Sequence, residues 1–484
     1  MTDRRHILEA LTGLLLALFI STLASTVVST ALPRMLADLH GSPTQYTWVV
    51  TATLLAATAA TPIWGKLADL YDKKRLIQAA TVVFVAGSIA AGLAQNGGQL
   101  IAARALQGIG VGGLQSLVQI AIGAMIPPRE RGKYAGYLSS VTAVSTIGGP
   151  LLGGFIVDTS WLGWRWCFFI GVPFAVAALV LLQLTLRLPV VRRTNVRIDY
   201  AGAGLLTAGV SLLLIWISFV DDAFAWASWQ TAALAGGALV LLGLAAWVET
   251  RAAEPVVPPR VLRRRTTALA ILGSLAAGTA MFGAAVFLSQ YFQVSRGHTP
   301  TEAGLLTIPM MAGILVSSIV AGRLISRRGR IKPYLVTGAI SLTAGFALLG
   351  LVDEATSLPL IGAAMVLIGT GVGMTLQNFV LVVQNAVPLA DIGAASATVS
   401  FFRSLGGTIG VTVLGAVLAR QVAAHTAEGL PAPAAYGQST GTIFAISAGV
   451  ALLGVLAAVL MPSVSLRTSL DKPDTRTAAA AAGS

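Results

Sequence analysis

The sequence contains few charged residues. Asp, Glu, Lys and Arg make up 11% of its 484 residues, whereas a soluble protein carries about 25%. Hydrophobic residues account for 55%, and the mean hydropathy is +0.80. This balance predicts an all-α polytopic membrane protein with a lipid bilayer as its surroundings.

Cysteine and histidine are nearly absent. The single cysteine, Cys167, excludes an internal disulfide and a cysteine-based metal site. The four histidines stand far apart, at His6, His40, His298 and His425. We therefore expect no metal and no cofactor. The sequence also has no G-x-x-x-x-G-K-[ST] loop, which argues against a nucleotide-driven pump.

Acidic residues are missing from the centres of the apolar segments. None of the 19 Asp and Glu residues falls at the middle of a predicted span. The acids nearest to the membrane stand at span ends or in a short loop: Asp69, Asp72, Asp158, Asp199, Glu249 and Glu302. A membrane-embedded enzyme would need an acid pair, a nucleophile or a metal cluster at membrane depth, so the sequence argues against an enzyme.

The net charge of +13 is spread along the chain in small groups. Nucleic-acid binding would need a clustered basic patch, so no nucleic-acid partner is expected. Arg104 and Arg403 fall inside predicted helices, and four arginines lie on one side of the membrane: Arg34, Arg165, Arg296 and Arg420. The other 26 of the 32 Lys and Arg residues lie on the opposite side. This bias predicts that both termini are cytoplasmic.

The chain contains about fourteen apolar segments, from 11–32 to 441–461, and one charged loop occurs twice. GKLADLYDKKR runs from Gly65 to Arg75, and GRLISRRGRIK runs from Gly322 to Lys332. The repeat follows the second and the tenth segment and so predicts two like bundles with two inserted helices. The predicted parts are an N-terminal six-helix bundle (1–187), the inserted pair with its linkers (188–266), a C-terminal six-helix bundle (267–461) and a disordered cytoplasmic tail (462–484).

Several motifs resemble the major facilitator superfamily. GKLADLYDKKR is similar to its loop 2–3 signature, and LIAARALQGIG (100–110) is similar to its fourth-helix motif. SSVTAVSTIGGPLLGG, ending at Gly154, resembles the fifth-helix motif of drug and proton antiporters. WRWCFFIGVP and STVVSTALP resemble the fourteen-helix multidrug exporter branch. The resemblance covers residues 10–461.

The resemblance implies two six-helix bundles built from inverted 3+3 repeats, joined by the two inserted helices. It implies a monomeric secondary transporter that exports an amphipathic small molecule, with the proton as coupling ion and alternating access. Uptake, or the transport of an endogenous metabolite or lipid, is the nearest alternative. A channel or a sensor fits the repeats and the Gly-Pro segment less well.

The family's loop is thought to latch one conformation. Carried over by position, the latch comprises Gly65, Asp69, Lys73, Lys74, Arg75, Gly322 and Arg330. Gly65 would allow close helix approach, and Asp69 would pair with a cation or a helix N-terminus. The loop departs from the family at Asp72, where glycine is usual, and Ser326 replaces the acid in the second copy.

Polar residues in the apolar segments are candidates for a substrate cavity. Arg104, Gln107, Gln115 and Gln119 form a stripe on one predicted helix. A buried arginine is tolerated where it faces protein or water, so the stripe is either a cavity wall or a structural network. The same alternatives apply to the remaining candidates, which are Gln290, Tyr291, Gln377, Asn378 and Arg403.

Small residues and a proline interrupt the fifth segment. Gly149, Pro150, Gly153 and Gly154 predict a bend or seal that serves as a gate, with close helix packing as the alternative.

The resemblance also exposes a missing acid. The multidrug branch usually has an aspartate where this chain has Ala24. If transport is coupled to protons, the titrating group would be peripheral, with Asp69, Asp158 and Glu302 as candidates, or the substrate would carry the proton. With arginines and no central acid in the helices, neutral or weakly acidic substrates are expected, and dications are not.

Overall fold

The computed structural model describes residues 2–39, 43–159, 161–186, 199–220, 224–252, 255–463 and 465–467. Among these residues, thirteen helical segments are long and apolar enough to cross a membrane. A further long helix, α5, begins with a basic stretch and carries several Ser and Thr residues. The expected all-α membrane architecture is confirmed.

The N-terminal bundle contains the first seven helices of the chain. They are α1 (Thr2–Asp38), α2 (Pro43–Leu70), α3 (Lys73–Gly92), α4 (Gly97–Met125), α5 (Pro128–Asp158), α6 (Trp166–Phe169) and α7 (Gly171–Thr185). Side-chain capping determines where several of the helices begin. Asn96 accepts a hydrogen bond from the Gln99 backbone N–H at the start of α4, as expected for an Asn N-cap. Cys167 is buried in this bundle.

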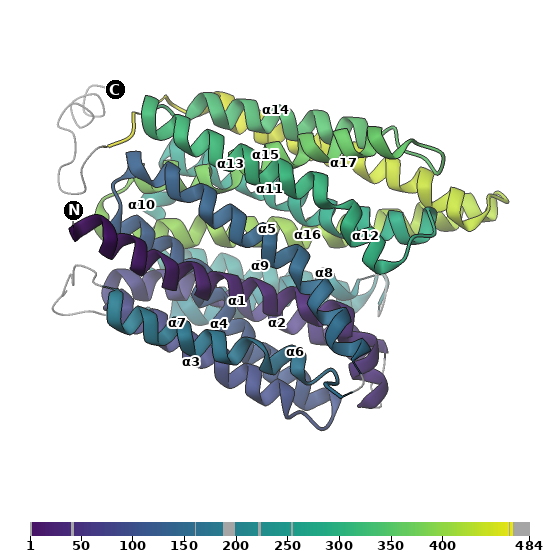
Figure 1. The fold of residues 1–484 in the computed structure, drawn as a ribbon, viewed down its shortest axis with the longest axis horizontal. Helices are drawn as coiled ribbons and strands as arrows, with labels where there is room; N and C mark the ends of the chain where they lie inside the picture. The colour runs from purple at the N-terminus through teal and green to yellow at the C-terminus, as the bar shows by residue number, and fades with distance from the viewer. Residues whose placement is uncertain are drawn as a thin grey trace.

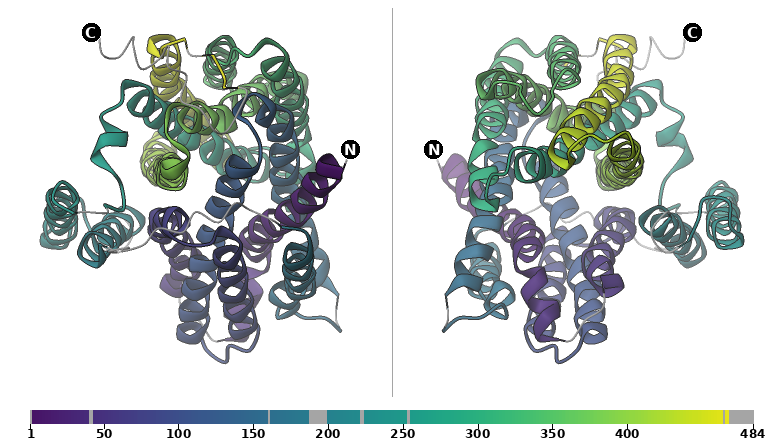
Figure 2. Two further views of the ribbon diagram at one scale, coloured as in Figure 1. Left: turned by 90° about the vertical axis from the view of Figure 1, so that its left-hand side faces the viewer. Right: turned by 90° about the vertical axis from the view of Figure 1, so that its right-hand side faces the viewer.

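Two helices form the inserted pair, α8 (Tyr200–Phe219) and α9 (Trp229–Glu249). Figure 2 shows this teal pair beside the two bundles, to one side of them. Helix α8 packs against α9, α2 and α16. Val210 and Leu214 of α8 join Phe401 and Leu405 of α16 in one apolar cluster. The inserted pair therefore touches both bundles.

The C-terminal bundle follows the short α10 (Pro259–Leu262). It contains α11 (Arg265–Gln290), η1 (Tyr291–Ser295), α12 (Pro300–Leu306), α13 (Ile308–Arg328), α14 (Lys332–Leu349), α15 (Leu358–Ala386), η2 (Leu389–Asp391), α16 (Ile392–Ala427) and α17 (Ala432–Leu460). Each bundle has its own buried apolar clusters. In Figure 1 the C-terminal bundle lies above the N-terminal bundle.

The bundles contact each other through two helix pairs, and each bundle contributes one helix to each pair. Helix α5 packs on α13 as well as on α1, and α16 packs on α2 as well as on α11. The two charged loops, between α2 and α3 and between α13 and α14, lie at the end where α1 begins, on the left in Figure 1. We call this end of the molecule the hinge end.

The predicted disordered tail, 462–484, lies mostly outside the described residues. Within it, Ser465–Arg467 contacts both bundles. Ser465 forms an antiparallel bridge with Arg330, and Leu466 is buried among residues of the C-terminal bundle. The Arg129 backbone N–H of α5 donates to the Arg467 carbonyl over 3.1 Å.

Candidate functional site: the contact between bundles at the hinge end

Asp69 binds the opposite bundle from the last turn of α2, because the predicted loop Gly65–Arg75 is helical up to Leu70 and again from Lys73. This side chain is 7% exposed, and its two oxygens accept hydrogen bonds from the backbone N–H groups of Gly393 (2.8 Å) and Ala394 (2.7 Å). Both donors lie in the first turn of α16, where backbone N–H groups lack helical partners. A carboxylate there is also favoured by the helix dipole. Asp69 therefore caps a helix of the other bundle.

Gly65 makes this contact possible. A Cβ placed on Gly65 would overlap with the Cβ of Ala397 and would stand 2.9 Å from the Gly393 carbonyl oxygen. Helices α2 and α16 thus approach at backbone distance. Only glycine fits at this position while Asp69, one turn later, reaches the start of α16.

The second hinge loop repeats the approach without the acid. A Cβ on Gly322 of α13 would overlap with the Gly132 carbonyl of α5. Ser326 stands at the position of Asp69; its Oγ is buried without a hydrogen-bond partner and faces Gly132. The Arg129 Nε of α5 donates to the Ser326 carbonyl over 3.2 Å. The second contact therefore relies on carbonyl groups and packing.

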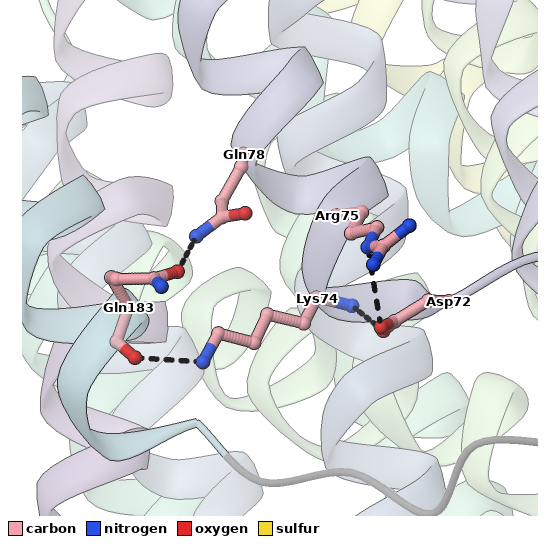
Figure 3. Close-up of polar contacts among 5 residues, drawn as sticks. All are labelled: Asp72, Lys74, Arg75, Gln78 and Gln183. Atoms are coloured by element: carbon pink, nitrogen blue, oxygen red, sulfur yellow. Dashed lines mark hydrogen bonds and ion pairs between the residues drawn. The ribbon is translucent and has the colours of Figure 1, made fainter.

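Lys73 interacts electrostatically with Asp69, whereas Lys74 and Arg75 have other partners in this state. Lys74 Nζ donates to the Gln183 carbonyl of α7 over 2.7 Å. Asp72 accepts from the Lys74 backbone N–H over 2.9 Å and lies 4.0 Å from Arg75 Nε. Figure 3 shows these contacts around the start of α3. Asp72, the departure from the family pattern, is thus the N-cap of α3. Arg330 is exposed, and its backbone bridges to Ser465.

A buried polar cluster joins four helices behind the latch. Arg131 of α5 is 4% exposed, and its Nη1 donates to Gln384 Oε1 of α15 over 2.9 Å. Gln384 Nε2 donates to Ser396 Oγ of α16 over 2.9 Å. Ser400 Oγ of α16 donates to Gln119 Oε1 of α4 over 3.4 Å. These hydrogen bonds close the hinge end between the bundles.

Three residues of this cluster, Gln119, Arg131 and Gln384, line a cavity of about 30 Å³. This volume holds a water molecule and excludes an amphipathic substrate. Of the predicted cavity residues, the structure brings Gln119 and Gln377 together here, beside Arg131 and Gln384. Arg131 and Gln384 were not predicted from the sequence as site residues. Gln384 is a polar residue within an apolar run, and this feature could have indicated it.

Arg104 and Gln107 lie inside the N-terminal bundle. Arg104 donates to the carbonyls of Val49 (3.4 Å) and Ala24 (3.5 Å), and to Gln107 Oε1 over 2.5 Å. Gln107 then donates to Ser88 Oγ over 2.8 Å. The described contacts are those of a structural network, which ties α4 to α1, α2 and α3. At position 24 the backbone carbonyl accepts from the guanidinium. Gln115 is half-buried on the same helix.

Three other predicted cavity residues lie within the C-terminal bundle. Gln290 is exposed and accepts from Tyr436 OH over 2.8 Å. Tyr291 OH donates to the Asp353 carbonyl over 2.7 Å. Asn378 donates to the Met374 carbonyl over 2.6 Å, and its Oδ1 is buried without a partner. The first two contacts fix the end of α11 opposite the hinge end.

Arg403 lies on the same face of α16 as Ser396 and Ser400, because steps of four and three residues keep side chains aligned. Its Nη1 is buried without a hydrogen-bond partner. A cation at this depth is costly unless it faces protein, water or a ligand. Arg403 is therefore the strongest candidate for contact with a substrate among the predicted residues.

The residues of the predicted gate in α5 lie in different environments. A Cβ on Gly149 would overlap with Thr26 Oγ1 of α1, so this glycine allows close packing inside the N-terminal bundle. Gly153 is buried, whereas a Cβ on Gly154 would meet no atom within 4 Å. Helix α5 is continuous through Pro150, whose side chain lies outside the described residues.

Asp69 and Glu302, the two proton-coupling candidates with described side chains, have separate partners. Asp69 caps α16, and Glu302 forms a capping box with Thr299 at the start of α12 and lies 3.4 Å from His298. Asp158 is the last residue of α5, and its side chain lies outside the described residues.

Two helical bundles and, among the described residues, thirteen segments that are long and apolar enough to cross a membrane define a polytopic membrane protein. The model of the Major Facilitator Superfamily matches residues 14–411. The chain belongs to this superfamily and is a multi-pass transporter of the cell membrane, not an enzyme.

Relatives and solved structures support this assignment. A multidrug transporter of Bacillus subtilis, MdtP, is 35% identical over 411 residues, which cover 84% of this chain and 74% of that protein. The efflux pump FUS6 of Gibberella moniliformis is 31% identical over 418 residues, or 84% and 73% of the two chains. The proton:xylose symporter XylE has a TM-score of 0.65 at 15% identity, with 96% and 97% of the chains covered. This last similarity concerns the fold.

Proposed function

We propose that this protein is a secondary exporter of amphipathic small molecules that works by alternating access in exchange for protons. The observation that carries the proposal is the cap that Asp69 of one bundle places on α16 of the other. Such a contact exists only while the hinge end is closed, so it favours one of two states. The names of MdtP and FUS6 support export of drugs or related compounds.

The hinge end is proposed to face the cytoplasm, because the charge bias places most Lys and Arg residues on that side. The structure then corresponds to a state closed toward the cytoplasm. Export of an endogenous metabolite or lipid is the second candidate, and the relatives' names favour it less.

The proposed substrates are neutral or weakly acidic. Arg403 offers a buried Nη1 without a partner, and Arg104 has carbonyl and amide acceptors in its described contacts. A cation in a site of low dielectric repels a second cation by several kcal/mol at about 4 Å. Dicationic compounds are therefore expected to be poor substrates.

Resistance measurements test this proposal. Cells that express the protein are compared with cells that express the Asp69→Asn variant at equal membrane levels. We expect protection against neutral and weakly acidic antibiotics, and little protection against divalent cationic dyes of similar size. Protection confined to the divalent dyes would contradict the substrate class. Transport in vesicles that ignores an imposed pH gradient would contradict proton exchange.

A further inference from the structure

Two acidic side chains meet where the inserted pair joins the N-terminal bundle. Asp199 is the N-cap of α8, and its Oδ1 accepts from the Gly202 backbone N–H over 2.7 Å. Glu249 is the last residue of α9, and its Oε2 accepts from the Val257 backbone N–H over 3.1 Å. Each carboxylate thus has one oxygen bound to the backbone.

The other oxygen of each carboxylate lies close to Gly202. Asp199 Oδ2 and Glu249 Oε1 are both buried without a hydrogen-bond partner, and Glu249 is 6% exposed. A Cβ on Gly202 would overlap with Asp199 Oδ2 and would stand 3.0 Å from Glu249 Oε1. Two ionised carboxylates in such a place repel each other and lose solvation, whereas one bound proton removes both penalties.

The charged surroundings of the pair are few among the described residues. Lys66 of α2 is 5% exposed and interacts electrostatically with Glu249. The α16 face that packs on α8 is apolar, with Phe401 and Leu405. Arg251 follows α9 and stacks on Trp247, 4.1 Å from the ring centre. Lys66 stands next to Gly65 and three residues before Asp69, so this pair adjoins the latch.

We propose that Asp199 and Glu249 form a shared proton-binding site. The protonation state of this site determines how strongly the inserted helices attract α2 in the closed state. When the proton is absent, the pair is anionic and attracts Lys66. When one proton binds, that attraction weakens and the closed hinge end becomes less stable. The role in coupling rests on the proposed proton exchange, but proton binding itself does not.

Infrared titration of the full-length protein in lipid tests the site directly, with pH as the only probe. We expect the wild type to show the C=O band of a buried, protonated carboxyl group that disappears as the pH rises. Glu249→Gln should lose this band, because the most buried carboxyl group is gone. Asp199→Asn should keep a band that disappears at a lower pH, because Glu249 stays buried but no longer has a like charge beside it. Each amide keeps an oxygen for its backbone N–H, so folding should persist. Glu428→Gln, an exposed acid at the end of α16, should retain the band.

A wild-type protein without such a band at any pH would overturn the site, and a band that disappears at the same pH in Asp199→Asn as in the wild type would show that the two acids do not share the proton. Spin labels at Tyr71 and Arg327, both exposed at the hinge end, supply the second measurement. Their separation should increase at acidic pH in the wild type and should not respond to pH in Glu249→Gln. If this response is present while transport ignores a pH gradient, proton exchange fails and the proton site stands.

Discussion

At the scale of single residues, two acids of the segment Gly65–Arg75 have different partners. Asp69 reaches 324 positions along the chain to the start of α16, whereas Asp72 caps its own helix α3. Both residues are aspartates. The partner alone decides which of them joins the bundles.

Asp69→Ala should destabilise the closed hinge end. It removes two hydrogen bonds to an ionised acceptor, each worth about 1.5–3 kcal/mol where the group is buried. We expect the separation between the hinge loops to increase in distance measurements with spin labels, and transport to fall strongly while substrate affinity in detergent changes little. Asp72→Ala is the matched control, since its lost contact lies inside one bundle. An equal effect of both variants would contradict the latch.

Ser326→Asp should strengthen the second contact. The new carboxylate would lie near the start of α5, where the helix dipole favours a negative charge by about 0.3–1 kcal/mol. The closed state should gain population, and turnover should slow where reopening limits it. Ser326→Asn provides the neutral comparison of equal size. A closed population that stays the same in Ser326→Asp would rule out this role for position 326.

At the scale of helices, glycines divide into those that join bundles and those that pack within one. Gly65 and Gly322 lie between bundles, and Gly149 lies between α5 and α1 of the same bundle. The sequence marks all three as small residues and does not reveal this difference, which depends on the neighbour of each.

Gly65→Ala should shift the protein toward the open hinge end, because overpacking at a tight contact costs about 1–3 kcal/mol. Gly149→Ala should instead lower the thermal stability of the protein, since its bundle cannot separate to relieve the overlap. Gly148→Ala is the control, because a Cβ there meets no atom within 4 Å. Accessibility of the hinge end and melting temperature measure the two effects separately.

Prediction from the sequence succeeded for local features and failed for distant partners. The charged repeat, the apolar segments and the small residues gave the superfamily and the helix plan. The sequence predicted that the partner of Asp69 is a cation or a helix N-terminus. It did not indicate that this partner is the N-terminus of α16. Arg131, Gln384 and the meeting of Asp199 with Glu249 were likewise hidden, because each depends on tertiary contacts between remote segments.

At the scale of the whole molecule, the hydrogen bonds that join the bundles in the described part of the chain lie at the hinge end. Ser465–Arg467 adds to them from beyond the last helix. Arg467 Nη2 donates to the carbonyls of Asn385 and Val387, the latter over 2.9 Å, and its own carbonyl accepts from Arg129 of α5. This segment therefore fastens α15 to α5.

Arg467→Ala should weaken the closed state by about 1–3 kcal/mol, since it removes charged hydrogen bonds to buried carbonyls. The expected sign is a larger spacing between spin labels on the two hinge loops. Arg420→Ala, which removes an arginine stacked on Trp226 at a ring distance of 5.9 Å, is the comparison. If the spin-label spacing is unchanged in Arg467→Ala, the segment Ser465–Arg467 does not stabilise the closed state.

The burial of Cys167 has a practical consequence for all these experiments. Its side chain is 4% exposed and sits among apolar residues of the N-terminal bundle. Thiol reagents should therefore leave Cys167 of the folded protein unmodified. A cysteine introduced at any exposed position would be the sole reactive thiol, so the natural sequence already serves as a background for site-directed labelling.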